Sequence, residues 1–537
     1  MKILYANGKI FTSNETHPYV DSMLVEDGKI VWTGAHEEIA GETDRAGGSG
    51  FEIADLIGRT VMPGFVDAHM HPMMMAEYSR QIPCLYPHIE SIAKLTEEIA
   101  AAAEKTPEGG WIRGFGYDEE KYTERRSPNR YDLDAGCSDK PVFLVRCCEH
   151  IRCVNSMALK IAGITKDTPD PPGGSIDRDG SGEPTGILRD NARDLVLPYI
   201  PKETDEEMVD ALADLGMTLA SQGITAIADM GNLRPGGNYE YFIKAMKKGF
   251  RQRVTMYYMW DYFMDDPEFV ITPQLMDPES RIRLAGIKLI GDGSISGKTA
   301  WLSKQYRNTD EYGKPVYSDE SMEKAIGFAK RSGCQISIHA MGGRAVDRIV
   351  QRFKDEEDWT DAKSPYLRIE HVTEISDEAL NTAAEKGFAL VSQPIFEYSE
   401  IEAYKSSMDE ERLKHIYPYR TELERGAKIC LSTDAPANSW AVPTDPFTNL
   451  KAAVTRVAYD GTDTGKSERL DIETAVKLYT REAAEICGFA GSGELSPGCS
   501  ADFIVLSDDI FTSAPEDIDK VQVEETYIGG EKVFSRR

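Results

Sequence analysis

Apolar and polar positions follow two alternating patterns through the middle of the chain. Eight short apolar runs are strand candidates: TVMPGFVDAHMH, GITAIADM, RVTMYYMW, AGIKLIGDG, CQISIHAMG, YLRIEHV, FALVSQP and KICLSTDAP. Between them lie stretches with helical spacing, such as SMEKAIGFAKRSG and SDEALNTAAEKG. Gly223, Gly333 and Gly387 each follow a helical stretch, where a left-handed cap is expected. Repeated βα units of this kind predict an α/β fold, a (β/α)8 TIM barrel over residues 61–485.

The two ends of the chain have a different pattern, with short strands and tight turns. Asn7-Gly8 and Asp27-Gly28 lie between alternating apolar runs and predict hairpins, and Gly529-Gly530 predicts a turn near the C-terminus. Two β-rich ends that flank a long middle predict one composite β-sandwich domain, made of residues 1–60 and 486–537.

The connection between the first and second strand candidates is too long for one βα unit. Residues 75–220 contain the glycine- and proline-rich stretch PDPPGGSIDRDGSGEPTG and a strand-like run of their own, KPVFLVRCC. These features predict an inserted subdomain rather than a structureless loop. Because the connection leaves from the strand end that carries polar residues, we expect it to form a lid over the barrel mouth.

Net charge, apolar content and cysteine count make some classes of partner and of protein unlikely. A formal net charge of −29 over 537 residues disfavours nucleic acid and anionic membranes, which leaves a small-molecule substrate. No uninterrupted apolar run of about 18 residues is present, so no membrane span is predicted. The nine cysteines are few for this length, odd in number and scattered, and no C-x-x-C pair is present, which disfavours both a disulfide framework and a zinc knuckle. We expect a soluble cytoplasmic protein, with a homodimer as the default assembly.

Metal-ligand side chains stand at the carboxyl ends of several strand candidates. His69 and His71 are two residues apart, so both imidazoles can face the same side of a strand. His339, His371 and Asp434 end the fifth, sixth and eighth runs. Any one of these histidines could be a hydrogen-bonded core residue, but four of nine histidines at one barrel rim favour a metal site. Imidazoles with a carboxylate suit Zn²⁺, Mn²⁺ or Fe²⁺.

Several of these segments together resemble the successive strand motifs of the amidohydrolase superfamily. They are PGFVDAHMH, GIKLIGDGSISGKTA, IHAMGGRAVD, RIEHV, VSQP and STDAP. They are similar to the branch called amidohydrolase family three, which includes N-substituted formamide deformylase-like proteins. GELSPGCSADFIVLS also resembles the return segment of that family's composite β-sandwich. The resemblance covers nearly the whole chain, in order.

The resemblance implies a site for two divalent metal ions, expected to be zinc, with manganese or iron as alternatives. The implied ligands are His69, His71, Lys288, His339, His371 and Asp434. His69, His71 and Asp434 would hold the more buried ion, and the other two histidines would hold the second. Lys288 would carry a carbamate derived from CO₂ and bridge the ions; carboxylation needs a neutral amine, which burial favours. The alternative is an unmodified Lys288 paired with Asp292.

The implied reaction is hydrolysis of a carbon–nitrogen bond in an amide, formamide or cyclic amide, in EC class 3.5. Metal coordination would lower the pKa of water toward about 7, giving a hydroxide nucleophile, and would polarise the carbonyl. Asp434 would act as general base and then general acid, with Lys288 as the second catalytic residue. Two alternatives stay open. One is another metal-assisted reaction, such as deamination, decarboxylation or isomerisation; the other, which the complete ligand set disfavours, is a non-catalytic regulator.

Candidate substrate contacts lie beyond the strand ends and in the insertion. They are His150, Ser294, Lys298, Trp301, Arg344 and Gln393. Arg344 could instead cap the next helix or pair with Asp347. His150 belongs to RCCEHIRCVNSMAL, which resembles the family's D-G-H-x-x-x-x-N-S-x-A-L pattern, although Cys148-Glu149 replaces the usual Asp-Gly. His150 and Asn155 could equally have a structural role.

Overall fold

The computed structural model describes residues 2–39, 51–147, 150–232, 236–360 and 364–536. The chain forms two compact units. The larger comprises the described parts of Met1–Met73, Leu212–Ala435 and Thr444–Arg537, and the smaller comprises Met74–Ala211 and Pro436–Pro443. Among the described residues, no helix is both long enough and apolar enough to cross a membrane.

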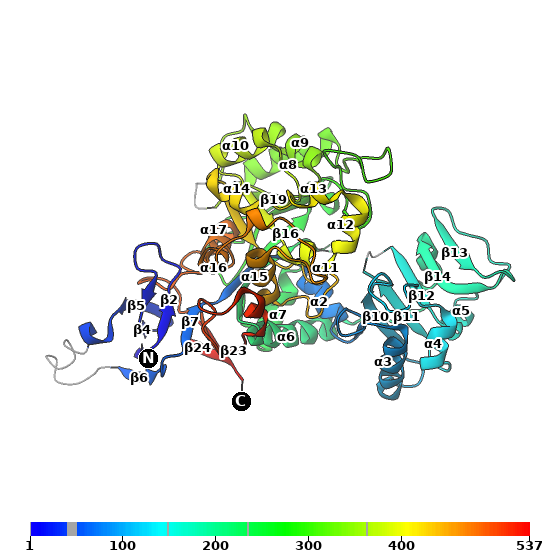
Figure 1. Cartoon of the computed structure of the whole chain (residues 1–537), viewed down its shortest axis with the longest axis horizontal. Coiled ribbons are helices and arrows are strands. Elements are labelled where there is room, and N and C mark those ends of the chain that lie inside the picture. Colours follow the sequence, from blue (N-terminus) through cyan, green and yellow to red (C-terminus); the bar gives the residue numbers. More distant parts are fainter. Residues whose placement is uncertain (1, 40–50, 148–149, 233–235, 361–363, 537) are drawn as a thin grey trace. The chain divides into compact units, whose positions relative to one another are not determined.

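An eight-stranded parallel barrel forms the centre of the larger unit (Figure 1). Its strands follow one another in chain order around the sheet. They are β8 (Phe65–Met70), β15 (Ile224–Met230), β16 (Arg253–Met259), β17 (Ile282–Ile290), β18 (Gln335–Ala340), β19 (Leu367–His371), β20 (Ala389–Ser392) and β21 (Lys428–Leu431). Seven lie within one of the eight predicted runs, and β17 overlaps its run but begins three residues earlier, so the predicted TIM barrel is confirmed.

Backbone hydrogen bonds beyond the last strand bring the ends of β21 and β8 together. Asp434 N–H donates to the His69 carbonyl at 2.8 Å, and His71 N–H donates to the Ala435 carbonyl at 2.7 Å. Asp67 adds a side-chain link, because its carboxylate accepts from Thr433 N–H at 3.1 Å and from Thr433 Oγ1 at 2.5 Å. The seam between the first and last strands is therefore built by residues that flank the candidate ligands.

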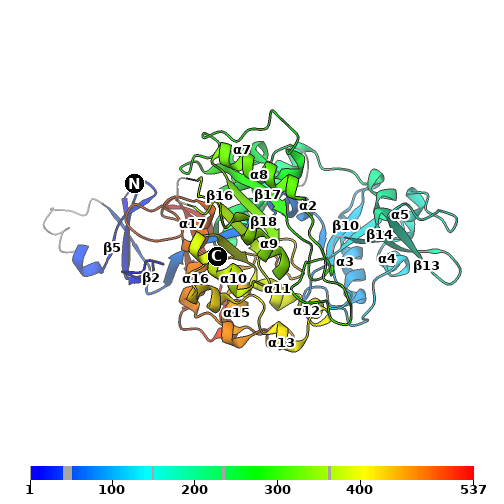
Figure 2. The same cartoon turned by 90° about the horizontal axis from the view of Figure 1, so that it is seen from above.

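Amphipathic helices cover the outside of the barrel. They include α7 (Tyr239–Lys247), α8 (Asp319–Ser332), α9 (Gly343–Phe353), α10 (Asp377–Lys386), α15 (Pro446–Thr455), α16 (Ile472–Leu478) and α17 (Arg481–Cys487). Helices α8 and α9 contact β18, and Figure 2 shows both beside it. Gly333 and Gly387 end α8 and α10 in the left-handed conformation, each with φ 67°, as predicted.

Strands from both chain ends share one six-stranded sheet in the larger unit. Its order is β24 (Glu531–Ser535), β23 (Val523–Ile528), β22 (Phe503–Leu506), β7 (Thr60–Pro63), β2 (Lys9–Phe11) and β3 (Tyr19–Val20). A four-stranded sheet has the order β5 (Lys29–Gly34), β4 (Ser22–Glu26), β1 (Lys2–Ala6) and β6 (Glu52–Asp55). Tyr5 of β1, Ile10 of β2 and Phe503 of β22 belong to one buried cluster, so the two sheets share a core.

One predicted hairpin is present and one is wrong. Asp27-Gly28 joins the antiparallel pair β4 and β5, with both residues at positive φ. Asn7-Gly8 does not join a hairpin, because β1 and β2 lie in different sheets. Asn7 does adopt positive φ, at 59°, but the turn carries the chain from one sheet to the other. The shared apolar core of the two sheets, rather than local pairing, decides the direction of the chain there.

The smaller unit has its own sheet and core. The sheet order is β13 (Gly174–Arg178), β14 (Pro184–Asp190), β12 (Ile151–Val154), β11 (Val142–Arg146), β10 (Ile112–Tyr117) and β9 (Ile82–Pro83). Helices α3 (Ile92–Lys105) and α4 (Arg130–Gly136) supply residues to its core. KPVFLVRCC contains β11, as predicted. Segment 436–443 joins this unit through hydrogen bonds such as Lys121 Nζ to Ser439 Oγ at 2.7 Å. A lid over the barrel mouth stays a prediction.

Candidate metal centre

Four imidazoles and a carboxylate converge at the carboxyl ends of the barrel strands. The His69 and His371 rings are 4.8 Å apart between centroids, and the His371 and His339 rings are 4.3 Å apart. Asp434 Oδ1 lies 3.3 Å from His69 Nε2 and 3.1 Å from His71 Nε2. His69, His371 and Asp434 each offer a ligand atom within 4.8 Å of the others. The predicted histidines and Asp434 therefore lie together.

Lys288 stands on β17 among these groups and is almost fully buried, with 2% of its surface exposed. Its Nζ has no hydrogen-bond partner among the described residues. Burial lowers the pKa of Lys288 to about 8. Pairing with Asp292 is not seen in the described structure, because that carboxylate instead accepts from the backbone N–H groups of Met341, Gly342 and Trp301 at 2.8–2.9 Å.

Hydrogen bonds to the outer ring nitrogens fix the orientation of three of the four histidines. His69 Nδ1 lies 2.8 Å from Glu370 Oε2, and His339 Nε2 lies 3.0 Å from the Gly293 carbonyl. His371 Nδ1 lies 2.7 Å from Gln393 Oε1. Since these acceptors require the ring nitrogen to carry a proton, the second nitrogen of each ring is left with a lone pair.

The electrostatics keep these groups in the form that binds a cation. Burial lowers the pKa of His69 to about 4, and burial also lowers the pKa of His339 and His371. Burial alone would raise the pKa of Asp434, but the neighbouring His69 and His71 imidazoles hold it below its usual value. His69, His339 and His371 are therefore neutral and Asp434 is ionised near neutral pH.

This donor set fits a divalent cation. Neutral imidazoles with an ionised carboxylate form a nitrogen and oxygen site of the kind that zinc occupies. Two buried polar atoms here, His71 Nδ1 and Lys288 Nζ, have no hydrogen-bond partner among the described residues. Buried polar atoms are normally satisfied, so these atoms point to a bound group at this position.

The contacts of Gln393 differ from those expected of a residue that binds the substrate. It is fully buried, its Oε1 faces His371, and its Nε2 donates to Ser432 Oγ at 2.9 Å. Both ends of the amide are therefore occupied, which favours support of His371 over contact with a substrate. The sequence position at the end of β20 was compatible with either role.

The other expected substrate contacts are divided between the two units. Ser294, Lys298 and Trp301 lie on the loop after β17, and Trp301 N–H donates to Asp292. Arg344 is exposed in the first turn of α9, and its guanidinium lies 4.0 Å from the centre of the Tyr312 ring rather than pairing with Asp347. All four follow the carboxyl ends of β17 or β18. Their contact with a substrate stays a proposal.

The two expected contacts in the smaller unit have local partners there. His150 is exposed and lies 3.1 Å from Asp190 Oδ1. Asn155 is fully buried; it caps α5 (Ser156–Ile161) and donates to the carbonyls of Cys137 and Lys140 at 2.9 Å. A structural role accounts for every Asn155 contact. Cys148-Glu149 lies outside the described residues.

Two buried carboxylates near the ligands were not found from the sequence. Glu370 precedes His371 on β19 and faces His69. Asp229 lies on β15, where its Oδ1 has no hydrogen-bond partner among the described residues. Burial raises the pKa of Asp229 to about 7, against the smaller opposing effects of Asn238 and His71. The sequence did hold a signal for both residues, because each is a charged residue inside an apolar run. Glu370 lies in RIEHV and Asp229 lies in GITAIADM.

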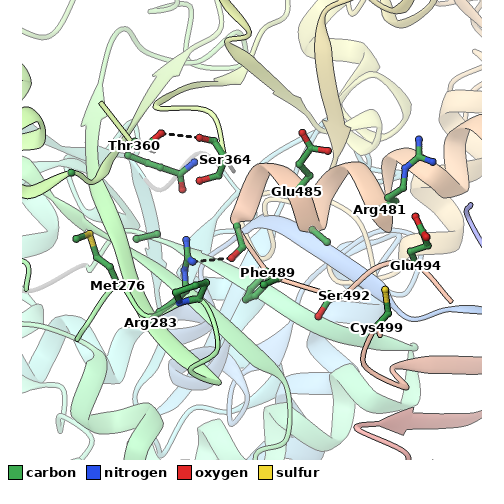
Figure 3. A pocket seen from close by; sticks show the side chains of 18 residues that line it. Met276, Arg283, Thr360, Ser364, Arg481, Glu485, Phe489, Ser492, Glu494 and Cys499 are labelled. Atoms are coloured by element: carbon green, nitrogen blue, oxygen red, sulfur yellow. Dashed lines mark hydrogen bonds between the residues drawn. The ribbon is translucent and has the colours of Figure 1, made fainter. Parts of the chain in front are cut away.

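A separate cavity of about 740 Å³ lies at the amino-terminal ends of the strands (Figure 3). Its lining includes Arg283 at the start of β17 and Gln335 at the start of β18. Arg283 donates to the Gly488 carbonyl at 2.8 Å, which caps the end of α17. Lys288 is five residues further along β17, or roughly 16 Å at strand spacing, so this cavity is not the candidate metal centre.

Comparisons with known proteins agree with this geometry. The putative amidohydrolase YtcJ of Bacillus subtilis (strain 168) is 28% identical over 550 residues, covering 100% of both chains. The N-substituted formamide deformylase of Arthrobacter pascens is 26% identical over 547 residues, covering 99% of this chain and 98% of that one. The crystal structure of an uncharacterized metal-dependent hydrolase from Pyrococcus horikoshii OT3 has a TM-score of 0.73 and 26% identity, covering 96% of this chain and 99% of that one.

The profile of the amidohydrolase family matches residues 52–534. That range begins at β6 and ends in β24, and it contains all six implied ligands. This chain therefore belongs to the amidohydrolase family.

Proposed function

We propose that this metal-dependent hydrolase cleaves a carbon–nitrogen bond in an amide, formamide or cyclic amide, within EC class 3.5. One observation carries the proposal: the four histidines, ionised Asp434 and unpartnered Lys288 meet at one end of the barrel. Similarity to an N-substituted formamide deformylase over almost the whole chain supports this bond type. Family likeness alone does not decide the reaction, because one barrel hosts many chemistries.

We propose that this chain binds two divalent ions, expected to be zinc, with manganese or iron as alternatives. His69, His71 and Asp434 would hold one ion, and His339 and His371 the other. A bound ion of this kind lowers the pKa of water and polarises a carbonyl. We also propose that Lys288 carries a carbamate, since burial favours the neutral amine that reacts with CO₂.

Asp434 would move the proton in this reaction. Its carboxylate is ionised near neutral pH and can accept a proton from the attacking water. The same carboxyl group can then donate that proton to the departing amine nitrogen, which leaves as a neutral amine.

The test combines metal analysis with a substrate screen. We expect metal-reconstituted protein to hold two equivalents of zinc per chain and to release amine from at least one class of N-formyl, N-acyl or cyclic amide. Asp434→Asn is the matched control, and it should bind metal while releasing little amine. Protein that binds metal but converts these compounds without releasing an amine or opening a C–N bond would contradict the proposed bond type. Protein that binds no metal would contradict the centre itself.

A further inference from the structure

A buried ion pair lies directly behind His69, inside the barrel. Arg368 and Glu370 stand two residues apart on β19, and both are fully buried. Arg368 Nε donates to Glu370 Oε1 at 2.5 Å, and Ser337 Oγ donates to the same oxygen at 2.7 Å. The other carboxylate oxygen, Oε2, lies 2.8 Å from His69 Nδ1. Each Glu370 oxygen is thus engaged, and one holds a candidate metal ligand.

Arg368 also contacts the backbone of the strand that carries His69. Its Nη2 donates to the Ala68 carbonyl at 2.6 Å, immediately before that histidine. Its Nη1 donates to Tyr257 Oη at 3.1 Å, and Tyr257 in turn donates to Gln335 Oε1 at 2.6 Å. A continuous chain of hydrogen bonds therefore runs through the barrel interior from β18 to β8. It leaves the Arg368 guanidinium little freedom to move.

We propose that Glu370, held by Arg368, is the positioning residue for His69 and sets the metal affinity of this part of the centre. This inference rests on the proposed metal function. Among the four candidate histidines, His69 has the shortest contact between its outer nitrogen and a carboxylate, at 2.8 Å. His339 Nε2 lies 3.6 Å from Asp292 Oδ1 and is closer to the Gly293 carbonyl, and His371 Nδ1 faces the Gln393 amide oxygen. A carboxylate acceptor fixes the proton on Nδ1 and raises the basicity of Nε2.

A second buried ion pair in this chain serves as a control, because it separates the effect of losing a buried charge from an effect on His69. Arg456 and Glu397 form a second pair with 0% and 1% side-chain exposure and a 2.6 Å contact. Arg456 otherwise donates to backbone carbonyls such as those of Ile416 and Tyr417, and no contact with a candidate ligand is found in the described structure. Loss of charge in either pair should lower thermal stability. Only loss at Glu370 should change metal binding.

The experiment measures the zinc Kd of each full-length variant by competition with a chromophoric chelator. We expect Glu370→Gln to raise the zinc Kd by about 10- to 100-fold, because supporting partners of metal ligands contribute to that extent. Glu397→Gln should leave the zinc Kd within about twofold of the parent. Glu370→Asp, which keeps the charge, should recover part of the loss. An unchanged zinc Kd in Glu370→Gln, or an equal rise in Glu397→Gln, would overturn the inference.

A second measurement keeps the inference separate from the proposed function. In metal-free protein labelled with ¹⁵N-histidine, the parent should show His69 with the proton on Nδ1, and Glu370→Gln should weaken or redistribute that signal. If Glu370→Gln does not fold, Ser337→Ala removes one of the hydrogen bonds to Glu370 and should shift the same signal less. Parent protein with the proton on His69 Nε2 would refute the positioning role, whether or not the protein binds metal.

Discussion

Three residues at or next to the candidate ligands have positive backbone φ angles, which residues other than glycine rarely adopt. Asp434 has φ 55°, His371 has φ 80° and Val372 has φ 34°. The β-branched side chain of Val372 makes its conformation the least favourable of the three. Backbone hydrogen bonds offset the cost of these conformations. Asp434 N–H donates to the His69 carbonyl, and Val372 N–H donates to the Ala340 carbonyl at 3.1 Å. Strained backbone at these strand ends turns successive side chains toward one centre.

Substitution of Asp434 separates its two proposed roles. Asparagine tolerates positive φ as well as aspartate does and keeps one oxygen ligand, but it cannot carry a proton. We expect Asp434→Asn to lower kcat by about 10²- to 10⁴-fold, the usual contribution of a general acid–base group, while most of the metal stays bound. His69→Ala and His339→Ala should instead lose metal and activity together. Metal content by mass spectrometry and turnover, measured on one preparation, check this. Near-normal turnover in metal-loaded Asp434→Asn would exclude the proton-transfer role.

Carboxylation of Lys288 should depend on pH in a defined direction. Its pKa of about 8 means that roughly a tenth of the amine is neutral at pH 7 and roughly nine-tenths at pH 9. Since only the neutral amine reacts with CO₂, the carbamate signal in ¹³C spectra with labelled bicarbonate should grow as pH rises through 8 in metal-free protein. Lys288→Ala should lack the signal and activity, and a short carboxylic acid should restore part of the activity. A signal of equal size in Lys288→Ala would contradict this assignment.

The candidate ligands could be recognised in the sequence, but most of the groups that contact them could not. His69, His71, His339 and His371 are recognisable because each breaks an apolar run at its polar end. Glu370 lies inside such a run, where its partner on another strand is set by the barrel register and not by spacing. Asp229 is a similar case, whereas Gln393 was recognised from the sequence but in a different role. A single sequence does not reveal which residue of a distant strand lies opposite.

At the scale of elements, the seam between β8 and β21 is the feature on which the centre depends. Asp67 on β8 accepts hydrogen bonds from Thr433 N–H, Thr433 Oγ1 and His69 N–H. Thr433 immediately precedes Asp434, so this one carboxylate holds the backbone beside two candidate ligands. It joins the first and last strands of the barrel across 366 residues of sequence.

Removal of the Asp67 carboxylate should weaken the barrel at this seam. Asp67→Ala leaves two buried N–H groups without an acceptor, at a cost of about 2–4 kcal/mol in the free energy of unfolding. The control is Asp471→Ala, which removes a cap on the exposed start of α16 and should cost about 1 kcal/mol. Thermal unfolding of both variants shows which substitution lowers the stability more. We expect the zinc content to fall only in Asp67→Ala, and equal losses of stability in both would argue against a special role for the seam.

Helices and strands of the barrel could be predicted because each carries its own periodicity and cap. The chain ends were harder, because short strands pair according to a core shared between sheets. Asp27-Gly28 forms its hairpin since β4 and β5 are neighbours in one sheet. Asn7-Gly8 has the same local signal, but Tyr5 and Ile10 on either side of it lie in different sheets of one core. The inclusion of segment 436–443 in the smaller unit also has no local signal in the sequence.

At the scale of the whole molecule, the two chain ends fold together beside the barrel within the larger unit. β7 leads directly into β8, and it pairs with β22 from the other end of the chain. Gly64 N–H between these strands donates to the Asp502 carbonyl at 3.0 Å. The strand that carries His69 is therefore anchored at its start by residues more than 400 positions away. Folding of the chain ends and placement of the first two candidate ligands, His69 and His71, are physically linked.

A cluster of three aromatic rings joins the two chain ends and can be tested directly. Phe503 on β22 is fully buried, and its ring lies 5.0 Å from Tyr5 and 4.3 Å from Tyr527 between centroids. We expect Phe503→Ala to cost about 3–5 kcal/mol, since it removes a buried ring from between both ends. Val31→Ala, at a position with 41% exposure on β5, is the control and should have little effect. Hydrogen exchange should accelerate in β1, β4, β22 and β23, while β17 and β18 at the barrel centre stay protected. Equal acceleration in β17 would mean that the chain ends and the barrel unfold as one cooperative unit.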